Sequence, residues 1–569
     1  MERAVFTDKA SFGAVLVLVL TCLAGESFGV GTPWRTDTLT RRVDALFSDI
    51  DNENSPGAAV LVVSNGQVLL KKGYGMANLE HKVPVTPETV FDVASVSKQF
   101  TGMAIAMLVE EGTISLKDDI RKYIPEMPQF DDTITVGHLV HHTSGLRDWP
   151  GTLALAGWRM DDIISFDQIL RMAFHQQDLN FKPGSEYSYS NTGYNLLARL
   201  VERVSGKSFR EWTQEHIFSP LGMNHTHFHD EYSEVVPGKA YGYSRGGDGK
   251  HNAVANGLTA LGSSSLFTSI NDMARWVVNF ETHLVGGTAV WDRMLQREAL
   301  NNGDPNSYAF GLVIGTHRGL KTVSHSGGWA AFSTFVLHFP GEAFSVVVLM
   351  NHGSLSPGKT AYSIADLYLS AEMDARKPAG KEIRPDNHKP LEVPVAVLNS
   401  YTGTYRLGPA WYITISREGN RLITQATAES AMPMTPLSDT SFRVEGYGGS
   451  SITFIRDEQG KVTSFRYRGL TCPRVEPGML PDLAGLRTFA GIYYSEELET
   501  RYKLVIEDGK LKAMHKRHGA IELIPAWKDE FRGKAWFMPL VKFIRNEKGE
   551  ITGFLVSQPR SRNQRFDKM

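Results

Sequence analysis

Hydrophobic positions in the first two thirds of the chain follow the helical period in two places and a strand-like pattern in a third. Apolar residues recur at helical spacing over residues 100–108 and again over residues 194–204. Gly112 and Gly206 come just after these runs, and glycine is typical of a helix C-terminus. Residues 331–350 contain two strand-like apolar runs divided by a turn. This part of the chain therefore mixes helices with neighbouring antiparallel strands.

The C-terminal third has a different pattern, in which short alternating strands are broken by glycine and charged turns. This pattern occurs twice. The matching stretches are residues 401–405 with 489–493, and 454–457 with 543–546, at nearly the same offset. We therefore expect two tandem antiparallel β-barrel or sandwich modules, over residues 397–478 and 482–569.

The two ends of the first domain are marked by composition. Basic residues and then an apolar run over residues 12–24 predict a secretory signal peptide, residues 1–29. Residues 376–396 are rich in Pro, Lys, Arg and Glu, which is typical of a linker. The first domain then spans residues 30–375. Cys22 lies in the apolar run, but its surroundings fit a lipoprotein site poorly, so we expect no lipid anchor and no membrane span after cleavage.

Composition is that of a soluble globular protein, with 42% hydrophobic and 21% charged residues and a formal net charge of −2. This near balance gives no reason to expect nucleic acid or an anionic membrane as a partner. Only Cys472 remains after signal cleavage, so the mature chain can form no internal disulfide. We expect a secreted or periplasmic protein, and the sequence leaves its oligomeric state open.

Ser95 and Lys98 are the first candidates for chemistry, because they are separated by one helical turn where the first helical run begins. A serine there would lie at the positive end of the helix dipole. A buried lysine beside it loses its proton more easily, because desolvation disfavours the charged form. This pair can make a serine nucleophilic without histidine. The alternative for Ser95 is an ordinary helix N-cap.

Two other serines match catalytic patterns, and we reject both. Residues 356–359 repeat the Ser-x-x-Lys spacing, but Pro and Gly after the serine predict a turn rather than a helix. Residues 242–246 fit Gly-x-Ser-x-Gly, but a nucleophile elbow requires a helix after the serine, and here the sequence predicts a loop. The paired His141 and His142 lack metal-ligand spacing, so we expect no metal and no cofactor.

Three short motifs decide between these alternatives by their order. Ser95-x-x-Lys98, Tyr189-x-Asn191 and His325-x-Gly327 resemble the three motifs of the penicillin-recognising serine hydrolases, specifically the class C β-lactamase group. That group includes D-amino-acid peptidases and β-lactamase-like esterases. The resemblance covers about residues 40–370, and the segments 141–146, 220–223 and 266–276 support it.

The resemblance implies a role for each motif residue. Ser95 would attack a carbonyl, while Lys98 and Tyr189 would share the proton transfers, with Tyr189 as a phenolate or as a hydrogen-bonded relay. Asn191 would bind the substrate amide. The backbone N–H groups of Ser95 and Gly328 would form the oxyanion hole.

The third motif departs from the commonest pattern of the family. Many relatives carry a lysine where this chain has His325, and histidine is mostly neutral at pH 7. Without a fixed positive charge, efficient β-lactam hydrolysis is not expected, and substrates without a carboxylate near the scissile bond are favoured. Gly327 and Gly328 would let the backbone approach the substrate closely.

Together these observations predict an α+β protein: a β-lactamase/transpeptidase-like domain, with an antiparallel sheet flanked by helices and a helical subdomain, followed by two lipocalin-like β-barrels. We expect a secreted serine hydrolase that cleaves an amide or ester of a small molecule or short peptide, foremost a peptidase acting next to a D-amino acid. A carboxylesterase, a β-lactamase and a catalytically dead ligand-binding protein are the alternatives, in that order. The barrels could bind ligand, shield the site or only stabilise the chain.

Overall fold

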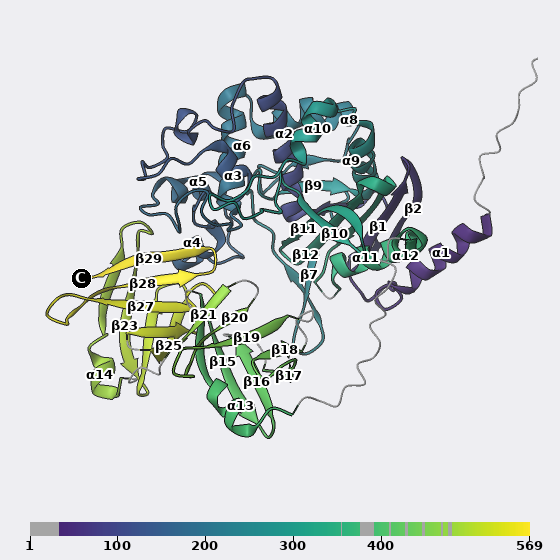
Figure 1. Ribbon diagram of the computed structural model, residues 1–569. Coiled ribbons are helices and arrows are strands. Elements are labelled where there is room, and N and C mark those ends of the chain that lie inside the picture. The colour runs from purple at the N-terminus through teal and green to yellow at the C-terminus, as the bar shows by residue number, and fades with distance from the viewer. Residues whose placement is uncertain are drawn as a thin grey trace, which may run out of the picture.

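The computed structural model describes residues 33–375 except 354, and residues 392–569 except 409–410, 427–430, 446–449, 468–469, 476–480 and 528. The predicted signal peptide and all but the last five residues of the predicted linker lie outside the described residues. The expected α+β architecture is confirmed: one mixed domain and two closed barrels (Figure 1).

A six-stranded antiparallel sheet, in the order β10-β11-β12-β13-β1-β2, forms the centre of the first domain. Its strands are β1 (Ala58–Ser64), β2 (Gln67–Tyr74), β10 (Val313–His317), β11 (Leu320–Trp329), β12 (Phe332–Phe339) and β13 (Phe344–Met350). The strands at the two ends of the domain's sequence lie side by side, since Val60 faces Val348. The two strand-like runs of residues 331–350 are thus confirmed as β12 and β13.

Both faces of this sheet are covered by helices, because alternate residues of its central strands are apolar on both sides. Val60 and Val62 of β1 pack with one group of helices, whereas Ala59 and Leu61 belong to the larger core on the other face. The first group consists of α1 (Pro33–Ala45), α11 (Pro357–Tyr368) and α12 (Ser370–Ala375).

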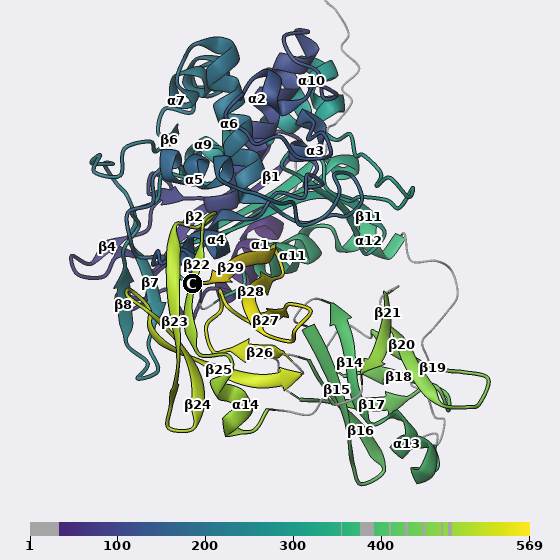
Figure 2. The same ribbon diagram turned by 90° about the vertical axis from the view of Figure 1, so that its left-hand side faces the viewer.

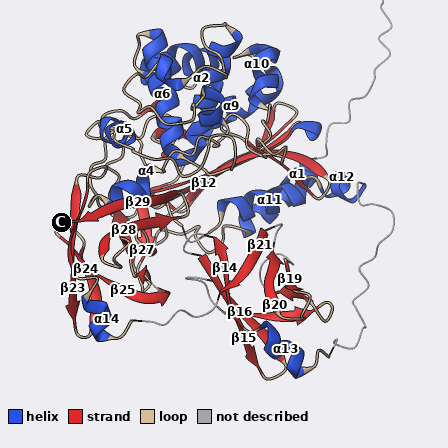
Figure 3. Cartoon of the chain, turned by 60° about the vertical axis from the view of Figure 1, so that its left-hand side comes forward, coloured by secondary structure: helices blue, strands red, loops and turns tan. Residues whose placement is uncertain are grey.

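A helical subdomain lies on the other side of the sheet (Figure 3). Its helices are α2 (Lys98–Glu110), α3 (Val136–Val140), α4 (Trp149–Leu155), α5 (Phe166–Phe174), α6 (Asn191–Ser205), α7 (Phe209–Thr213), α8 (Ser219–Leu221), α9 (Ile270–Thr282) and α10 (Gly287–Met294). Short strands connect them: β3 (Met76–Asn78), β4 (Val83–Pro84), β5 (Val90–Asp92), β6 (His227–Phe228), β7 (Gly242–Arg245), β8 (His251–Val254) and β9 (Leu266–Ser269). No helix in the described ranges has both the length and the hydropathy that crossing a membrane would require.

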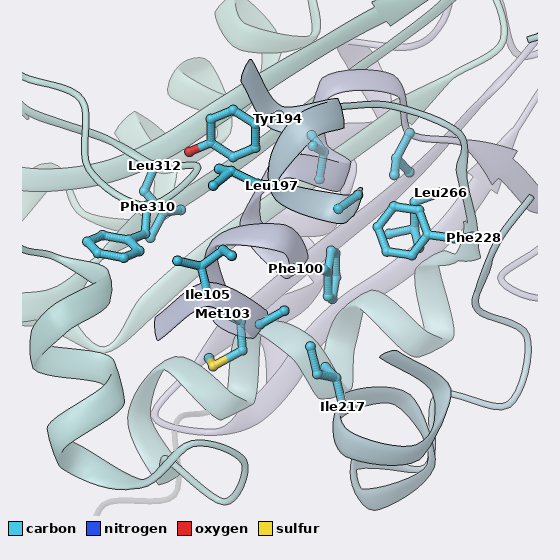
Figure 4. Packing of buried hydrophobic residues seen from close by; sticks show 14 of the residues in the cluster. Phe100, Met103, Ile105, Tyr194, Leu197, Ile217, Phe228, Leu266, Phe310 and Leu312 are labelled. Atoms are coloured by element: carbon cyan, nitrogen blue, oxygen red, sulfur yellow. The ribbon is translucent and has the colours of Figure 1, made fainter. Parts of the chain in front are cut away.

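The two helices predicted from periodicity, α2 and α6, pack against each other in the core of this subdomain (Figure 4). Phe100, Met103, Tyr194 and Leu197 are completely buried there. Gly206 ends α6 in the left-handed conformation that favours glycine, as its position predicted.

The turn predicted at residues 356–359 is wrong. Ser356 is the N-cap of α11, and its side chain accepts a hydrogen bond from the backbone N–H of Lys359. Pro357 then occupies the first helical position, where its fixed φ and missing N–H are both tolerated. The Pro-Gly pair marked a helix start rather than a turn.

Each C-terminal module is a closed eight-stranded antiparallel barrel, preceded by a short helix. Barrel 1 follows α13 (Val395–Tyr401) and comprises β14 (Gly403–Gly408), β15 (Trp411–Glu418), β16 (Arg421–Ala426), β17 (Met432–Pro436), β18 (Ser441–Val444), β19 (Ser451–Arg456), β20 (Val462–Tyr467) and β21 (Leu470–Val475). Barrel 2 follows α14 (Leu483–Arg487) and comprises β22 (Gly491–Ser495), β23 (Thr500–Glu507), β24 (Lys510–His515), β25 (Gly519–Trp527), β26 (Glu530–Gly533), β27 (Leu540–Arg545), β28 (Ile551–Gln558) and β29 (Ser561–Lys568).

The internal repeat corresponds to a shared detail of the two barrels. The hydroxyl of Tyr405 donates to the backbone oxygen of Tyr401 at 2.8 Å, and Tyr493 donates in the same way to Phe489 at 2.8 Å. These are the residues that the repeat pairs with one another, so the two modules are copies of one structure.

Barrel 2 packs directly against the helical subdomain, whereas barrel 1 lies beside barrel 2 (Figure 2). Ala154 and Leu155, at the C-terminal end of α4, belong to the hydrophobic core of barrel 2. Beside them Arg147 forms an ion pair with Glu497 whose side chains are only 1% and 7% exposed. The helix α4 is therefore shared between the first domain and the second barrel.

Candidate active site

Ser95 lies in a single 3-10 turn, η1 (Ala94–Ser97), between β5 and α2. This turn, rather than the helix itself, carries the serine, since α2 begins at Lys98. Ala94 has φ +47°, a left-handed conformation that is uncommon outside glycine. Its N–H donates to Asp92 Oδ1 at 2.8 Å, and the Ser97 hydroxyl donates to its carbonyl, so local hydrogen bonds hold the turn.

The Lys98 amine is fully buried and has three polar neighbours. Its Nζ donates to the backbone oxygen of Ser263 at 2.6 Å and to Asn191 Oδ1 at 2.7 Å, and lies 3.3 Å from Ser95 Oγ. Burial lowers the pKa of Lys98 well below its usual value. A neutral amine has two N–H groups, and these can donate to the Ser263 backbone oxygen and to Asn191 Oδ1. Its lone pair is then left facing the Ser95 hydroxyl, as a general base requires.

The Tyr189 ring lies beside Lys98, whose Nζ is 4.8 Å from the ring centroid, and Tyr189 borders the same open space as Ser95. Burial raises the pKa of Tyr189, so the protonated phenol is its resting form. Of the two roles left open by the sequence, this favours the hydrogen-bonded relay over the phenolate. The His142 ring packs on the Tyr189 ring at 4.3 Å between centroids and accepts a hydrogen bond from the Ser190 N–H, so His142 supports the site from behind.

The amide of Asn191 is held at both ends. Its Oδ1 accepts from Lys98, while its Nδ2 and its backbone N–H both donate to Asp148, at 3.2 and 2.7 Å. Asp148 is buried at the N-terminus of α4, and burial raises the pKa of its carboxyl, whereas Arg560 lowers it. Sequence reasoning missed Asp148, which fixes the orientation of Asn191 and thereby of Lys98.

His325 is buried on β11 with both ring nitrogens engaged. Nδ1 lies 2.7 Å from the backbone oxygen of Ser326, which can only accept, so Nδ1 carries the proton. Nε2 then accepts from the Tyr308 hydroxyl at 2.8 Å. Burial, aided by the nearby Lys98, lowers the pKa of His325 to about 3. This histidine is therefore neutral and brings no charge to the site.

The two glycines of the third motif have different surroundings. A Cβ at Gly327 would lie 2.2 Å from the backbone oxygen of Val93 and 2.3 Å from Thr334 Oγ1, whereas a Cβ at Gly328 would meet nothing within 4 Å. Gly327 thus lets β11 pack against the residue just before the η1 turn. Only Gly328 borders the open space in front of Ser95.

A cleft of about 490 Å³ opens in front of these groups. Ser95, Tyr189, Asn191, His325 and Gly328 all border it. Five of its lining residues are large aromatics: Trp149, Tyr187, Tyr189, Tyr308 and Trp329. The chain therefore brings its three motifs together at one partly apolar cleft.

The residues rejected as rival sites lie elsewhere. Ser244 is exposed on the two-stranded hairpin of β7 and β8, with no helix after it, and Ser356 is an exposed helix cap. Outside the cleft, His227, His229 and Glu234 lie close enough together to hold a metal ion, and Arg210 forms an ion pair with that glutamate. His141 and His142 do not form such a group within the described part of the chain.

Comparison with known proteins assigns the family. The family model described as Beta-lactamase matches residues 43–369, and a domain of unknown function, DUF3471, matches residues 387–479. A fold and site of this kind define a serine hydrolase. The chain belongs to the beta-lactamase family, within the penicillin-recognising serine hydrolases, as the three motifs predicted.

Curated relatives point to the same family. The chain is 27% identical over 417 residues to "Penicillin-binding protein 4*" of Bacillus subtilis (strain 168), a match that covers 71% of this chain and 91% of that protein. It is 28% identical over 331 residues to "D-aminopeptidase" of Gluconobacter oxydans (strain 621H), over 58% of this chain and 62% of that protein.

Solved structures share the fold. The octameric penicillin-binding protein homologue from Pyrococcus abyssi superposes with a TM-score of 0.53 at 22% identity, covering 84% of this chain and 98% of that one. "EstCE1, a hydrolase with promiscuous acyltransferase activity" gives a TM-score of 0.51 at 22% identity, over 58% and 98%.

Proposed function

We propose that this chain is a secreted serine hydrolase that cleaves an amide or ester through an acyl-enzyme on Ser95, and that it acts next to a D-amino acid. The observation that carries the chemistry is the Lys98 amine, fully buried, tied to two fixed acceptors and 3.3 Å from Ser95 Oγ. It supports Ser95 as the nucleophile and Lys98 as the general base.

The proposed acylation follows from this arrangement. The Ser95 hydroxyl gives its proton to the Lys98 lone pair as Oγ forms a bond to the substrate carbonyl carbon. The negative charge on the carbonyl oxygen is stabilised by the N–H groups of Ser95 and Gly328. The leaving group departs as the carbonyl reforms, and it takes a proton through the Tyr189 hydroxyl. Water then attacks the acyl-enzyme by the reverse proton path and frees the acid.

The substrate class rests on separate observations. The similarity to a protein named D-aminopeptidase and the presence of the two barrels favour a D-amino acid beside the scissile bond. A carboxylesterase is the second candidate, because the aromatic lining of the cleft suits an acyl chain. A β-lactamase comes third, because His325 is neutral. All three motifs border one cleft with their residues intact, which argues against a catalytically dead binding protein.

Ser95→Ala tests the proposal directly. We expect turnover to fall by about a thousandfold or more, as loss of a nucleophile usually causes. The matched controls Ser244→Ala and Ser356→Ala, both at exposed serines, should remain near wild type. A panel of D- and L-aminoacyl anilides, D-Ala-D-Ala peptides, short p-nitrophenyl esters and nitrocefin assigns the substrate class.

Labelling with a fluorophosphonate identifies the reactive residue independently of the substrate. Mass spectrometry should find the adduct on Ser95 alone. An adduct on another serine, or full activity of Ser95→Ala, would overturn the mechanism. Faster turnover of L- than of D-aminoacyl substrates would overturn the substrate class but not the mechanism.

A further inference from the structure

We propose that Arg560 of barrel 2 is the anion-binding residue of the catalytic cleft, and that it selects substrates with a carboxylate close to the scissile amide or ester. The inference deepens the proposed function and rests on it. Arg560 is the only charged side chain among the described residues that line the cleft. It reaches the cleft from a different domain, on the turn between β28 and β29 (Figure 1).

The turn is fixed against the catalytic domain by its backbone. The Arg560 carbonyl accepts from the Asp148 N–H at 3.1 Å and from Asn180 Nδ2 at 2.9 Å. The next two residues continue this contact: Ser561 Oγ donates to the Asp148 carbonyl at 3.1 Å, and the Arg562 N–H donates to Asn180 Oδ1 at 2.7 Å. These hydrogen bonds across the interface fix the position of the Arg560 backbone.

The Arg560 guanidinium is aimed at the reacting groups. It lies over the Tyr189 ring, 4.8 Å from the centroid, and its Nη1 donates to Asp148 Oδ2 at 3.3 Å. Asp148 in turn holds Asn191, which contacts Lys98. Arg560 therefore contacts Tyr189 directly and is connected to Lys98 through Asp148 and Asn191.

One edge of the guanidinium is left for a ligand. Among the described residues only Asp148 accepts a hydrogen bond from it, and only from Nη1. The Arg560 side chain is 53% exposed, while the Asp148 side chain is 5% exposed. Arginine offers five N–H donors in a planar fork that matches a carboxylate in two-point fashion. A substrate carboxylate can bind the free edge while Asp148 orients the other.

The third motif explains why the cleft needs a positive charge from elsewhere to bind a substrate carboxylate. His325 is neutral and both its nitrogens are engaged, so it cannot attract a carboxylate. The preference for substrates without a carboxylate was predicted from His325 of the third motif alone. Arg560, which also lines the cleft, brings the missing positive charge from barrel 2.

Three esters with one leaving group test this selectivity. p-Nitrophenyl hexanoate, mono-p-nitrophenyl adipate and p-nitrophenyl 6-aminohexanoate differ only in a terminal methyl, carboxylate or aminomethyl group. We expect the wild-type kcat/KM to be highest for the adipate and lowest for the amine. In Arg560→Gln the adipate-to-hexanoate ratio should fall about tenfold or more, and Arg560→Glu should favour the amine. Arg560→Lys should retain a ratio above one.

Matched controls separate selectivity from structure. Arg565 lies on β29, the strand that follows the Arg560 turn, and bonds only to Asp567 among the described residues, so Arg565→Gln should match wild type on all three esters. A purely structural role of Arg560 would lower all three rates equally and leave the ratios unchanged, and that result would overturn the inference. So would a wild type that does not prefer the adipate to the amine.

The proposed function can fail separately. If Ser95 is not labelled by a fluorophosphonate in wild type, the acyl-enzyme mechanism fails. If Ser95 is labelled in wild type and in Arg560→Gln while the ester ratios stay equal, only the inference about Arg560 fails.

Discussion

Lys98 depends on a small set of neighbours for its chemistry, and Asp148 is the most remote of them. Burial lowers the pKa of Lys98, whereas the Asp148 carboxylate raises it and Arg560 lowers it again. The protonation state of the base is therefore set first by burial and then adjusted by one charge pair that lies outside the three motifs.

This predicts how the pH profile responds to Asp148→Asn. The base works only as a neutral amine, so kcat/KM should fall as pH drops through the pKa of Lys98. Removing the carboxylate removes the influence that raises this pKa, so the acid limb should move to lower pH. The measurement is kcat/KM of a neutral ester from pH 4 to pH 9. A shift of the limb to higher pH would contradict this assignment.

The residues of the site were predictable where they lie close together in sequence. Ser95 and Lys98 are one helical turn apart, so local spacing indicated this pair, whereas Tyr189 and Asn191 were indicated by the resemblance of the three ordered motifs to a known family. Asp148, Tyr308 and Arg560 follow no local pattern. Their place in the cleft depends on contacts between distant segments, which spacing along the chain cannot reveal.

Among the elements, strand β11 connects the third motif to the turn that carries the nucleophile. Gly327 lies where β11 meets the backbone of Val93, and Thr334 of β12 donates to the same carbonyl at 2.9 Å. The neighbouring Gly328 faces open space. Two adjacent glycines therefore serve different purposes.

Alanine at each glycine separates these purposes. Gly327→Ala should lower the free energy of unfolding by about 1–3 kcal/mol, as overpacking does, and should reduce activity by displacing the η1 turn. Gly328→Ala should change the free energy of unfolding by less than about 0.5 kcal/mol. Chemical denaturation of both variants, followed by tryptophan fluorescence, makes the comparison. Equal stabilities would show that the close approach at Gly327 is relieved without strain.

Periodicity predicted α2, α6, β12 and β13, because each has a buried face that its apolar residues mark. The turn predicted from the Pro-Gly pair after Ser356 was wrong, since Pro and Gly after a serine are compatible with a turn and with the first turn of a helix. Only the apolar residues further along α11 distinguish the two, and these pack on the sheet.

At the scale of the whole molecule, the ion pairs that help to hold barrel 2 to the catalytic domain differ in burial. The Arg147–Glu497 pair is almost fully buried, whereas the Arg171–Glu499 pair of the same interface is 67% and 53% exposed. The repeat in the sequence predicted two barrels, but their docking could not be predicted, because it depends on ion pairs and on α4 entering the core of barrel 2.

The two pairs predict different effects on docking. Glu497→Ala leaves the Arg147 charge buried and unpaired, which should destabilise the interface by about 3–5 kcal/mol. Glu499→Ala should cost no more than about 1 kcal/mol, because water screens the exposed pair. Hydrogen exchange of the β28–β29 turn is the measurement, and it should quicken in the first variant only. Equal exchange in both variants would show that the apolar contacts of α4 hold the barrel alone.

The placement of Arg560 also means that catalysis and substrate selection depend on different domains and can change separately in evolution. Ser95, Lys98 and Tyr189, which act on the scissile bond, belong to the catalytic domain. Arg560, which selects substrates by their charge, is carried by a turn of barrel 2. That turn is closed by the ladder between β28 and β29, in which Gln558 faces Ser561. A substitution at position 560 can therefore change the substrate selectivity while Ser95 and Lys98 both remain present, although it also removes one influence on the pKa of Lys98. A new substrate specificity can thus evolve by substitutions in barrel 2 while the intermediates keep their catalytic serine and lysine.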